Sequence, residues 1–90
     1  MLSVLAHQPL RMRFEGEEFI PDTAGEWTIQ SLSYFETQAI MQAEGIDNIR
    51  ATLEQGLVDC PGGKQAFLAC PSSRYVHPLY RAIWAHTSGN

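Results

Sequence analysis

The chain has few of the features that mark a disulfide scaffold or a membrane protein. Its 90 residues include only two cysteines, Cys60 and Cys70, which is too few for a disulfide framework. No apolar run approaches the roughly 20 residues that cross a bilayer. The opening MLSVLAHQPLRMRF lacks the basic start and the apolar length of a signal peptide. We therefore expect a cytoplasmic protein with reduced thiols and no membrane partner.

The two cysteines flank a Pro-Gly-Gly segment that predicts a turn. If Gly62 and Gly63 form a two-residue hairpin turn, Cys70 lies five positions from the strand partner of Cys60, or about 17 Å away. A disulfide needs Cα atoms within about 7 Å, so this register excludes one. A longer irregular loop is the alternative that would allow it.

The sequence lacks the residue spacing that is usual for a zinc site or for a catalytic cysteine. Cys60, Cys70, His77 and His86 are suitable zinc ligands, but no two of them form the short knuckle of a structural zinc site. No nucleophile motif surrounds Cys60, although Lys64 is near it in sequence. We predict buried, unreactive cysteines, with no catalytic residue, no metal and no cofactor. A small thiol-dependent enzyme or redox protein using Cys60 remains the alternative.

Lysine and arginine are absent from the long segment between Arg13 and Arg50, and this gives the chain an uneven charge. That segment carries −8 and the remainder +4, for a net charge of −4. Such asymmetry steers association with a charged partner, or it belongs to an ordinary solvated surface. The carboxylates of the segment are Glu15, Glu17, Glu18, Asp22, Glu26, Glu36, Glu44 and Asp47.

The first part of the chain predicts strands. Residues 10–20 alternate apolar and polar side chains around Gly16, which is typical of a hairpin. Residues 26–32 contain Trp27 and Ile29, and we expect a third strand there, with a helical start as the alternative.

Two helices are expected next. Ser33 and Glu36 form a capping box that opens a helix ending at Gly45, with Phe35, Ala39, Ile40 and Ala43 as its apolar stripe and Tyr34 and Met41 on the far side. Asp47 then opens a second helix, with Ile46, Ile49 and Leu53 inward and Gly56 at its end.

The last third predicts a second hairpin and a final helix. Residues 57–60 and 64–70 would pair across Gly62 and Gly63, and residues 71–76 would be extended because they approach Pro78. Pro78 would open the last helix, with Gly89 beyond its end. The order ββ-β-αα-ββ-α makes residues 1–90 a single α+β domain. Its mainly antiparallel sheet would have about four to five strands, with two to three helices on one face.

Binding is the function that these patterns favour. We expect a small acidic module that binds a protein partner and acts as an inhibitor or adaptor of a larger machine, a profile shared by small proteins of phages and mobile elements. Large side chains that one small core does not need, such as Tyr34, Met41, Trp27 and Tyr75, would anchor the contact. The partner would present a basic surface, one suited to holding nucleic acid. The predicted partner-binding residues are Glu15, Glu17, Glu18, Asp22, Glu26, Tyr34 and Met41.

Two other binding modes stay open. The aromatic and basic residues of 74–86 resemble the mixture in single-stranded nucleic-acid binders. An acidic chain with only six basic residues has little capacity to neutralise phosphates, however, so nucleic-acid binding is the less favoured alternative. The same large side chains would also suit a homodimer, in which they face a second copy.

Overall fold

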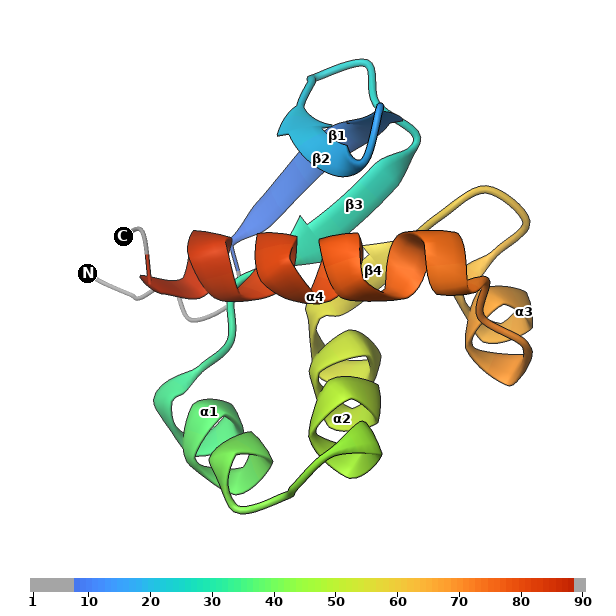
Figure 1. The fold of residues 1–90 in the computed structure, drawn as a ribbon. Helices are drawn as coiled ribbons and strands as arrows, with labels where there is room; N and C mark the ends of the chain where they lie inside the picture. Colours follow the sequence, from blue (N-terminus) through green and yellow to red (C-terminus); the bar gives the residue numbers. More distant parts are fainter. Residues whose placement is uncertain (1–7, 89–90) are drawn as a thin grey trace.

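The computed structural model describes residues 8–88, and it contains one four-stranded antiparallel sheet (Figure 1). β1 (Pro9–Glu15) and β2 (Glu18–Pro21) form the predicted hairpin, in which Gly16 takes a φ of 69° at the turn. β3 (Trp27–Gln30) and β4 (Leu57–Asp59) complete the sheet in the order β2-β1-β3-β4. The predicted α+β class and the first three strands are confirmed.

Four helices pack against this sheet or against one another, whereas two to three were predicted: α1 (Tyr34–Met41), α2 (Ile46–Gly56), α3 (Lys64–Ala69) and α4 (Ser73–Ser88). In Figure 1, α4 crosses the sheet, α2 lies against α4, and α1 and α3 lie on opposite sides of α2. No helix within residues 8–88 is long and apolar enough to cross a membrane.

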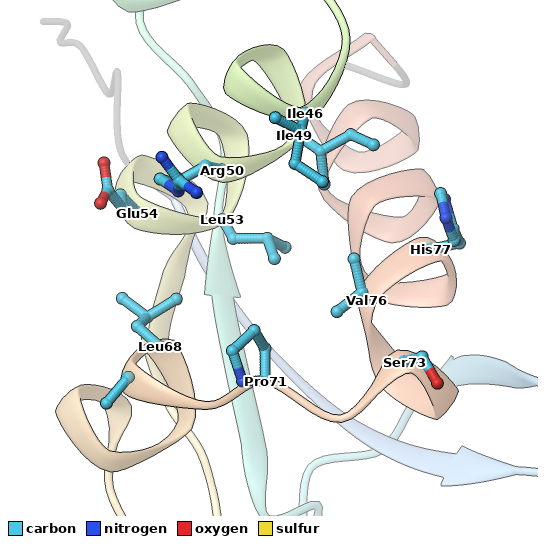
Figure 2. Close-up of a pocket in the computed structure, with 11 residues that line it drawn as sticks. Ile46, Ile49, Arg50, Leu53, Glu54, Leu68, Pro71, Ser73, Val76 and His77 are labelled. Atoms are coloured by element: carbon cyan, nitrogen blue, oxygen red, sulfur yellow. The ribbon is translucent and has the colours of Figure 1, made fainter.

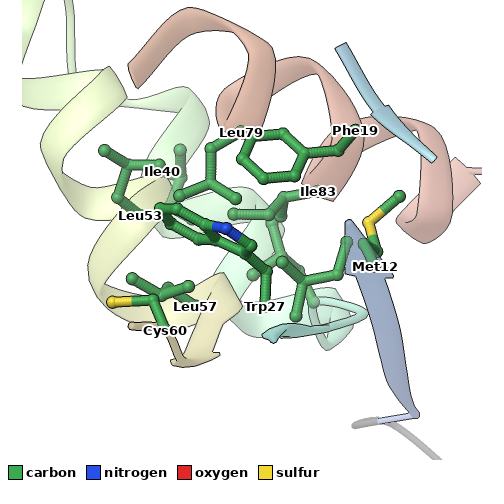
Figure 3. Close-up of a cluster of buried hydrophobic side chains, with 11 residues drawn as sticks. Met12, Phe19, Trp27, Ile40, Leu53, Leu57, Cys60, Leu79 and Ile83 are labelled. Atoms are coloured by element: carbon green, nitrogen blue, oxygen red, sulfur yellow. The ribbon is translucent and has the colours of Figure 1, made fainter. Parts of the chain in front are cut away.

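The core forms between one face of the sheet and α4. Alternating side chains of β1 and β3 point to this face, because successive residues of a strand face opposite sides. Leu10 pairs with Ile29 and Met12 with Trp27 in the β1–β3 register. The buried apolar residues are Met12, Phe19, Trp27, Ile29, Leu32, Ile40, Leu53, Leu57, Cys60, Leu79 and Ile83 (Figure 3).

Aromatic rings fill the part of the core beneath the first turns of α4. Phe14 and Phe19 pair across the hairpin with ring centroids 4.9 Å apart, and Tyr75 of α4 lies 4.9 Å from both Phe14 and Trp27. Edge-to-face pairs such as Phe14–Phe19 and Phe14–Tyr75 add stability beyond the area they bury. Trp27 is buried and Tyr75 is half-buried. They therefore belong to the core, and the expectation that they are surplus to it was wrong.

The capping box at α1 is confirmed, but the end of the helix is not. Ser33 Oγ accepts from the amide of Glu36 at 3.3 Å, and Glu36 Oε1 accepts from the amide of Ser33 at 2.9 Å. The helix ends at Met41, before Gly45. Gly45 instead precedes α2, which begins at Ile46 and not at Asp47.

The inward faces of the first two helices differ from the prediction. Ile40 and Leu53 are buried as expected, whereas Phe35 is 81% exposed and Ile46 is 69% exposed. The predicted apolar stripe of this helix contains both Phe35 and Ile40, but α2 covers only the side of α1 near Ile40. Tyr34 and Met41 do lie outward, as predicted.

The second hairpin does not form. β4 pairs with β3, and residues 64–69 form α3. Gly62 and Gly63 do reverse the chain, with φ values of 86° and 94°. The segment KQAFLA that follows consists mostly of good helix formers, and it adopts a helix once no strand lies opposite it. The register argument about Cys70 therefore fails with the hairpin.

The expected extended segment before Pro78 is helical. α4 begins at Ser73, and Pro78 lies inside it. A proline within a helix removes one amide donor and disfavours helical backbone in the residue before it, but packing of the helix on the sheet outweighs this cost. The apolar side of α4 contains Leu79 and Ile83, which are fully buried. Gly89, expected beyond the end of this helix, lies outside the described residues.

Candidate functional site

The outer surface of α1 combines large apolar side chains with an absence of charge. The exposed residues of this helix and its C-cap are Tyr34, Phe35, Gln38, Ala39, Met41 and Gln42, which we call the α1 face. Tyr34 is 70% exposed and Met41 63% exposed, and the rings of Tyr34 and Phe35 meet edge to face at 5.6 Å. None of the six residues is charged. Depletion of charge with enrichment of aromatics and methionine is typical of the core of a protein interface.

Asn48 of α2 holds α1 in place. Its Nδ2 donates to the carbonyl of Ile40, in the last turn of α1, at 2.9 Å and to the carbonyl of Ala43, two residues beyond the end of α1, at 3.2 Å. Its Oδ1 accepts from the hydroxyl of Tyr80 on α4 at 2.9 Å. One side chain thus joins three helices, and it adds a side-chain donor to the carbonyl of Ile40, which also accepts from the amide of Ala43 at 2.9 Å. The α1 face is therefore presented by a positioned helix.

A second polar contact fixes α2 against α4. Thr52, which is fully buried, donates through Oγ1 to the carbonyl of Asn48 at 2.9 Å and accepts from Nε1 of Trp84 at 3.2 Å. Buried polar groups are stable when they are bonded in this way. Tyr80 and Trp84 are thus engaged inside the molecule, which limits their use for stacking nucleic-acid bases.

The predicted acidic residues lie on the β1–β2 hairpin and the loop that follows it. Glu15, Glu17 and Glu18 surround the hairpin turn, and all three are exposed. Arg13 contacts Glu15 at 2.7 Å and Asp22 at 3.1 Å, so two of the predicted partner-binding carboxylates already have a cation beside them. Exposed ion pairs of this kind contribute little to stability.

The structure does not bring all the predicted site residues together. The hairpin with Glu15, Glu17 and Glu18 lies at one end of the molecule, and α1 with Tyr34 and Met41 lies at the other (Figure 1). α4 and the core separate the two groups. The acidic residues and the two large side chains therefore form two surfaces.

An apolar groove lies between α2, α3 and the first turns of α4, and we call it the α2–α4 groove. It has a volume of about 440 Å³. Leu53 and Val76 point into it from the two helices, and Pro71 closes one end (Figure 2). The residues that line it are Ile46, Ile49, Arg50, Leu53, Glu54, Leu68, Ala69, Pro71, Ser73, Val76 and His77.

The cysteines are both free, and they differ in environment. Cys60 is 4% exposed, as predicted, whereas Cys70 is exposed, so the prediction of a buried cysteine was wrong for Cys70. Burial raises the pKa of the Cys60 thiol above its ordinary value of 9.0, and the neighbouring carboxylate of Asp59 raises the pKa further. Less thiolate is then present at neutral pH, which opposes nucleophilic chemistry at Cys60.

Histidine does not complete a metal site in the part of the chain that the structure describes. No three side chains of His, Cys, Asp or Glu in residues 8–88 are grouped closely enough to hold an ion. His77 lines the α2–α4 groove. His86 lies at the other end of α4, with Nε2 2.8 Å from the carbonyl oxygen of Gln8.

The basic and aromatic residues of α4 form internal contacts. The guanidinium of Arg74 lies over the rings of Phe14 at 5.2 Å and Tyr75 at 5.7 Å. A cation on an aromatic face is favourable, and it occupies the surface on which a base would stack. This arrangement weakens the nucleic-acid alternative.

Phe35 and Ile46 are the exposed residues that sequence reasoning missed. The sequence did contain a signal, because YFETQAIM has large apolar residues on more than one side of the helix. A short helix that is apolar nearly all round needs cover on more than one side. In this molecule α2 supplies only one of those sides.

No known protein family, curated protein or solved structure matches this chain.

Proposed function

We propose that this chain is a small protein-binding module, an inhibitor or adaptor of a larger protein machine, and that the α1 face is its docking surface. The observation that carries the proposal is the exposure of Tyr34, Phe35 and Met41 on one uncharged helical surface. Monomeric proteins seldom leave adjacent aromatic and aliphatic side chains in water without a use for them. A partner that covers them gains the free energy of removing this apolar area from water.

The surroundings of the α1 face indicate the chemistry of the partner. Glu36, Glu44 and Asp47 lie on α1, in the turn after it and in the first turn of α2, and no Lys or Arg lies between residues 31 and 49. The partner surface would therefore have an apolar pocket with lysine or arginine at its rim. A surface that otherwise binds nucleic acid has this basic character.

The hairpin carboxylates have a separate role in this proposal. Glu15, Glu17, Glu18, Asp22 and Glu26 lie too far from α1 to share one small contact, as Figure 1 shows. Their field would still draw a basic partner toward the molecule, because steering acts over distances near the Debye length. They would change the rate of association more than the lifetime of the complex.

The test uses the tagged wild-type protein and matched variants. Proteins captured from the native lysate are identified, and the binding of each purified candidate is then measured. Phe35→Ala should weaken binding about thirtyfold, the effect of losing a hot-spot residue. Tyr34→Ala should raise the dissociation rate. Thr23→Ala, which alters an exposed loop residue away from α1, is the control and should bind as the wild type does.

Charge reversal tests the steering role on the same partner. Replacing Glu15, Glu17 and Glu18 with lysine should slow association about tenfold at low ionic strength, and added salt should reduce the difference. Equal affinities for the wild type, Phe35→Ala and Tyr34→Ala would remove the α1 face from the proposal.

A further inference from the structure

We propose that Met41 makes the α1 face sensitive to oxidation. A peroxide converts its thioether to the sulfoxide, and the face becomes more polar while the molecule stays folded. Release of the protein partner by this reaction rests on the proposed function, whereas the chemistry at Met41 does not.

The two methionines within residues 8–88 differ in their access to solvent. Met41, the last residue of α1, is 63% exposed, and Met12 of β1 is 4% exposed. A dissolved oxidant has to reach the sulfur atom before it can react, and the core covers Met12. Of these two side chains, Met41 is therefore the one that is oxidised in the folded protein.

The reaction is a two-electron oxidation at sulfur. The sulfur atom of Met41 attacks one oxygen of hydrogen peroxide, an S=O bond forms and the O–O bond breaks. The proton of the transferred oxygen passes to the leaving hydroxide, which departs as water, so the sulfur is oxidised and the peroxide is reduced. A thiol-dependent reductase reverses the change: two thiols become one disulfide, and the sulfoxide oxygen leaves as water.

The position of Met41 places this change within the α1 face. Met41 and Tyr34 are about two helical turns apart, so they lie on the same side of α1, with the uncharged Gln38 between them. A sulfoxide is polar, and a partner that covers it has to remove it from water. Of the two large apolar groups on this side, only Tyr34 then remains. Oxidation therefore weakens docking on an apolar partner surface.

The fold tolerates oxidation at Met41 but not at Met12. Ile40 is the buried residue of α1, and Met41 lies mostly in solvent. Met12 pairs with Trp27 in the sheet and belongs to the core, so a sulfoxide there would place a polar group among apolar side chains. Oxidation of Met41 is thus a reversible change of the surface, whereas oxidation of Met12 would damage the core.

Dilute hydrogen peroxide followed by peptide mass spectrometry tests the selectivity. Met41 should gain one oxygen about tenfold faster than Met12 in the folded protein, and the two should react at similar rates in denaturant. Hydrophobic-interaction chromatography then measures the polarity of the folded surface, and the oxidised protein should elute earlier with an unchanged circular dichroism spectrum. Equal rates for the two methionines in the folded protein would overturn the inference, and so would an unchanged elution.

Met41→Leu and Met12→Leu form a matched pair of variants, because each removes one thioether with little change in volume. Each protein is compared with itself before and after peroxide, and all of them keep Met1, Cys60 and Cys70. Peroxide should shift the elution of the wild type and of Met12→Leu, and it should leave that of Met41→Leu in place. A shift of Met41→Leu as large as that of the wild type assigns the effect to another residue and contradicts the proposal.

Binding of the protein partner separates this inference from the proposed function. Peroxide should weaken binding by the wild type and by Met12→Leu about tenfold, and the reductase should restore it. The affinity of Met41→Leu, whatever its starting value, should not change. Undiminished binding after complete oxidation of Met41 would remove the regulatory role. If the untreated wild type binds no protein partner but Met41 is oxidised selectively with earlier elution, the proposed function fails and the oxidation-sensitive α1 face stands.

Discussion

Helices α1 and α4 both carry several large apolar side chains, but these side chains differ in their exposure to solvent. α4 lies across the sheet and fully buries Leu79 and Ile83. α1 buries only Ile40 and leaves Tyr34, Phe35 and Met41 in solvent. The difference separates the residues that hold the fold from those that are available for binding. Four experiments sharpen or break this comparison.

The largest effect is expected from paired truncations in the two helices. Leu79→Ala should lower the free energy of unfolding by about 3 kcal/mol, because it leaves a cavity in a packed core. Phe35→Ala should change the free energy of unfolding by less than about 0.5 kcal/mol, as surface substitutions usually do. Urea denaturation of both variants measures the contrast. Similar losses in the two would mean that Phe35 is packed and not exposed.

Removal of the Asn48 side chain, which bonds to both α1 and α4, should have the next largest effect on the free energy of unfolding. Asn48→Ala should lower the free energy of unfolding by about 2 kcal/mol, because it removes bonds to Ile40, Ala43 and Tyr80. Amide hydrogen exchange should show faster exchange in α1, while the amides of β1 and β3 change only with global stability. Uniform acceleration across the chain would show that α1 unfolds only with the rest of the molecule.

A smaller loss is expected at Gly56, where α2 packs against Ile83 of α4. A Cβ at Gly56 would lie 2.5 Å from Cγ2 and 2.7 Å from Cδ1 of Ile83, which is fully buried. Gly56→Ala should therefore cost about 1 kcal/mol of unfolding free energy, although alanine favours the helix. The double variant Gly56→Ala with Ile83→Ala should be more stable than the sum of the two single losses predicts. Additive losses would mean that the two positions are not in contact.

The last prediction concerns the two cysteines, which should differ in reactivity. Their expected effect on the free energy of unfolding is the smallest of the four. Iodoacetamide at neutral pH should label Cys70 in the folded protein and spare Cys60 until denaturant is added. The pKa of Cys60 is raised in the folded state, so the unfolded thiol ionises first as pH rises. The contribution of Cys60 to stability is present below its unfolded pKa and declines above it. Rapid labelling of Cys60 in the native state would instead favour the thiol-dependent alternative.

The strands were predictable because their signals are local. Alternation around Gly16 and the register of the first hairpin depend only on neighbouring residues and turn chemistry. The capping box at Ser33 is local in the same way. The exposure of Phe35 on α1 was not predictable, because it depends on where α2 lies. Phe35 and Ile40 are both apolar, and only the position of the neighbouring helix distinguishes them.

The prediction for residues 60–78 was wrong for a different physical reason. The Pro-Gly-Gly segment does turn the chain, but a turn does not require a strand after it. The helix propensity of residues 64–69 decided their structure, and β3 was the available partner for β4. Proline prefers the first turn of a helix, and this preference predicted the start of α4 at Pro78. The packing of Tyr75 and Leu79, on either side of Pro78, outweighs that preference. The α2–α4 groove could therefore not be predicted from the sequence, because its walls come from three helices whose relative positions the sequence does not give.

The two borders of the sheet also restrict how this protein meets other chains. β2 forms one border, with Glu18 at its start and Pro21, which has no amide hydrogen, at its end. β4 forms the other border and is only three residues long. Neither offers a long row of free backbone groups for an added strand, so fibril-like stacking and capture of extended peptides are both disfavoured. Recognition by this molecule therefore depends on its helices, where a single side chain can be altered without disturbing the hydrogen-bonded ladder.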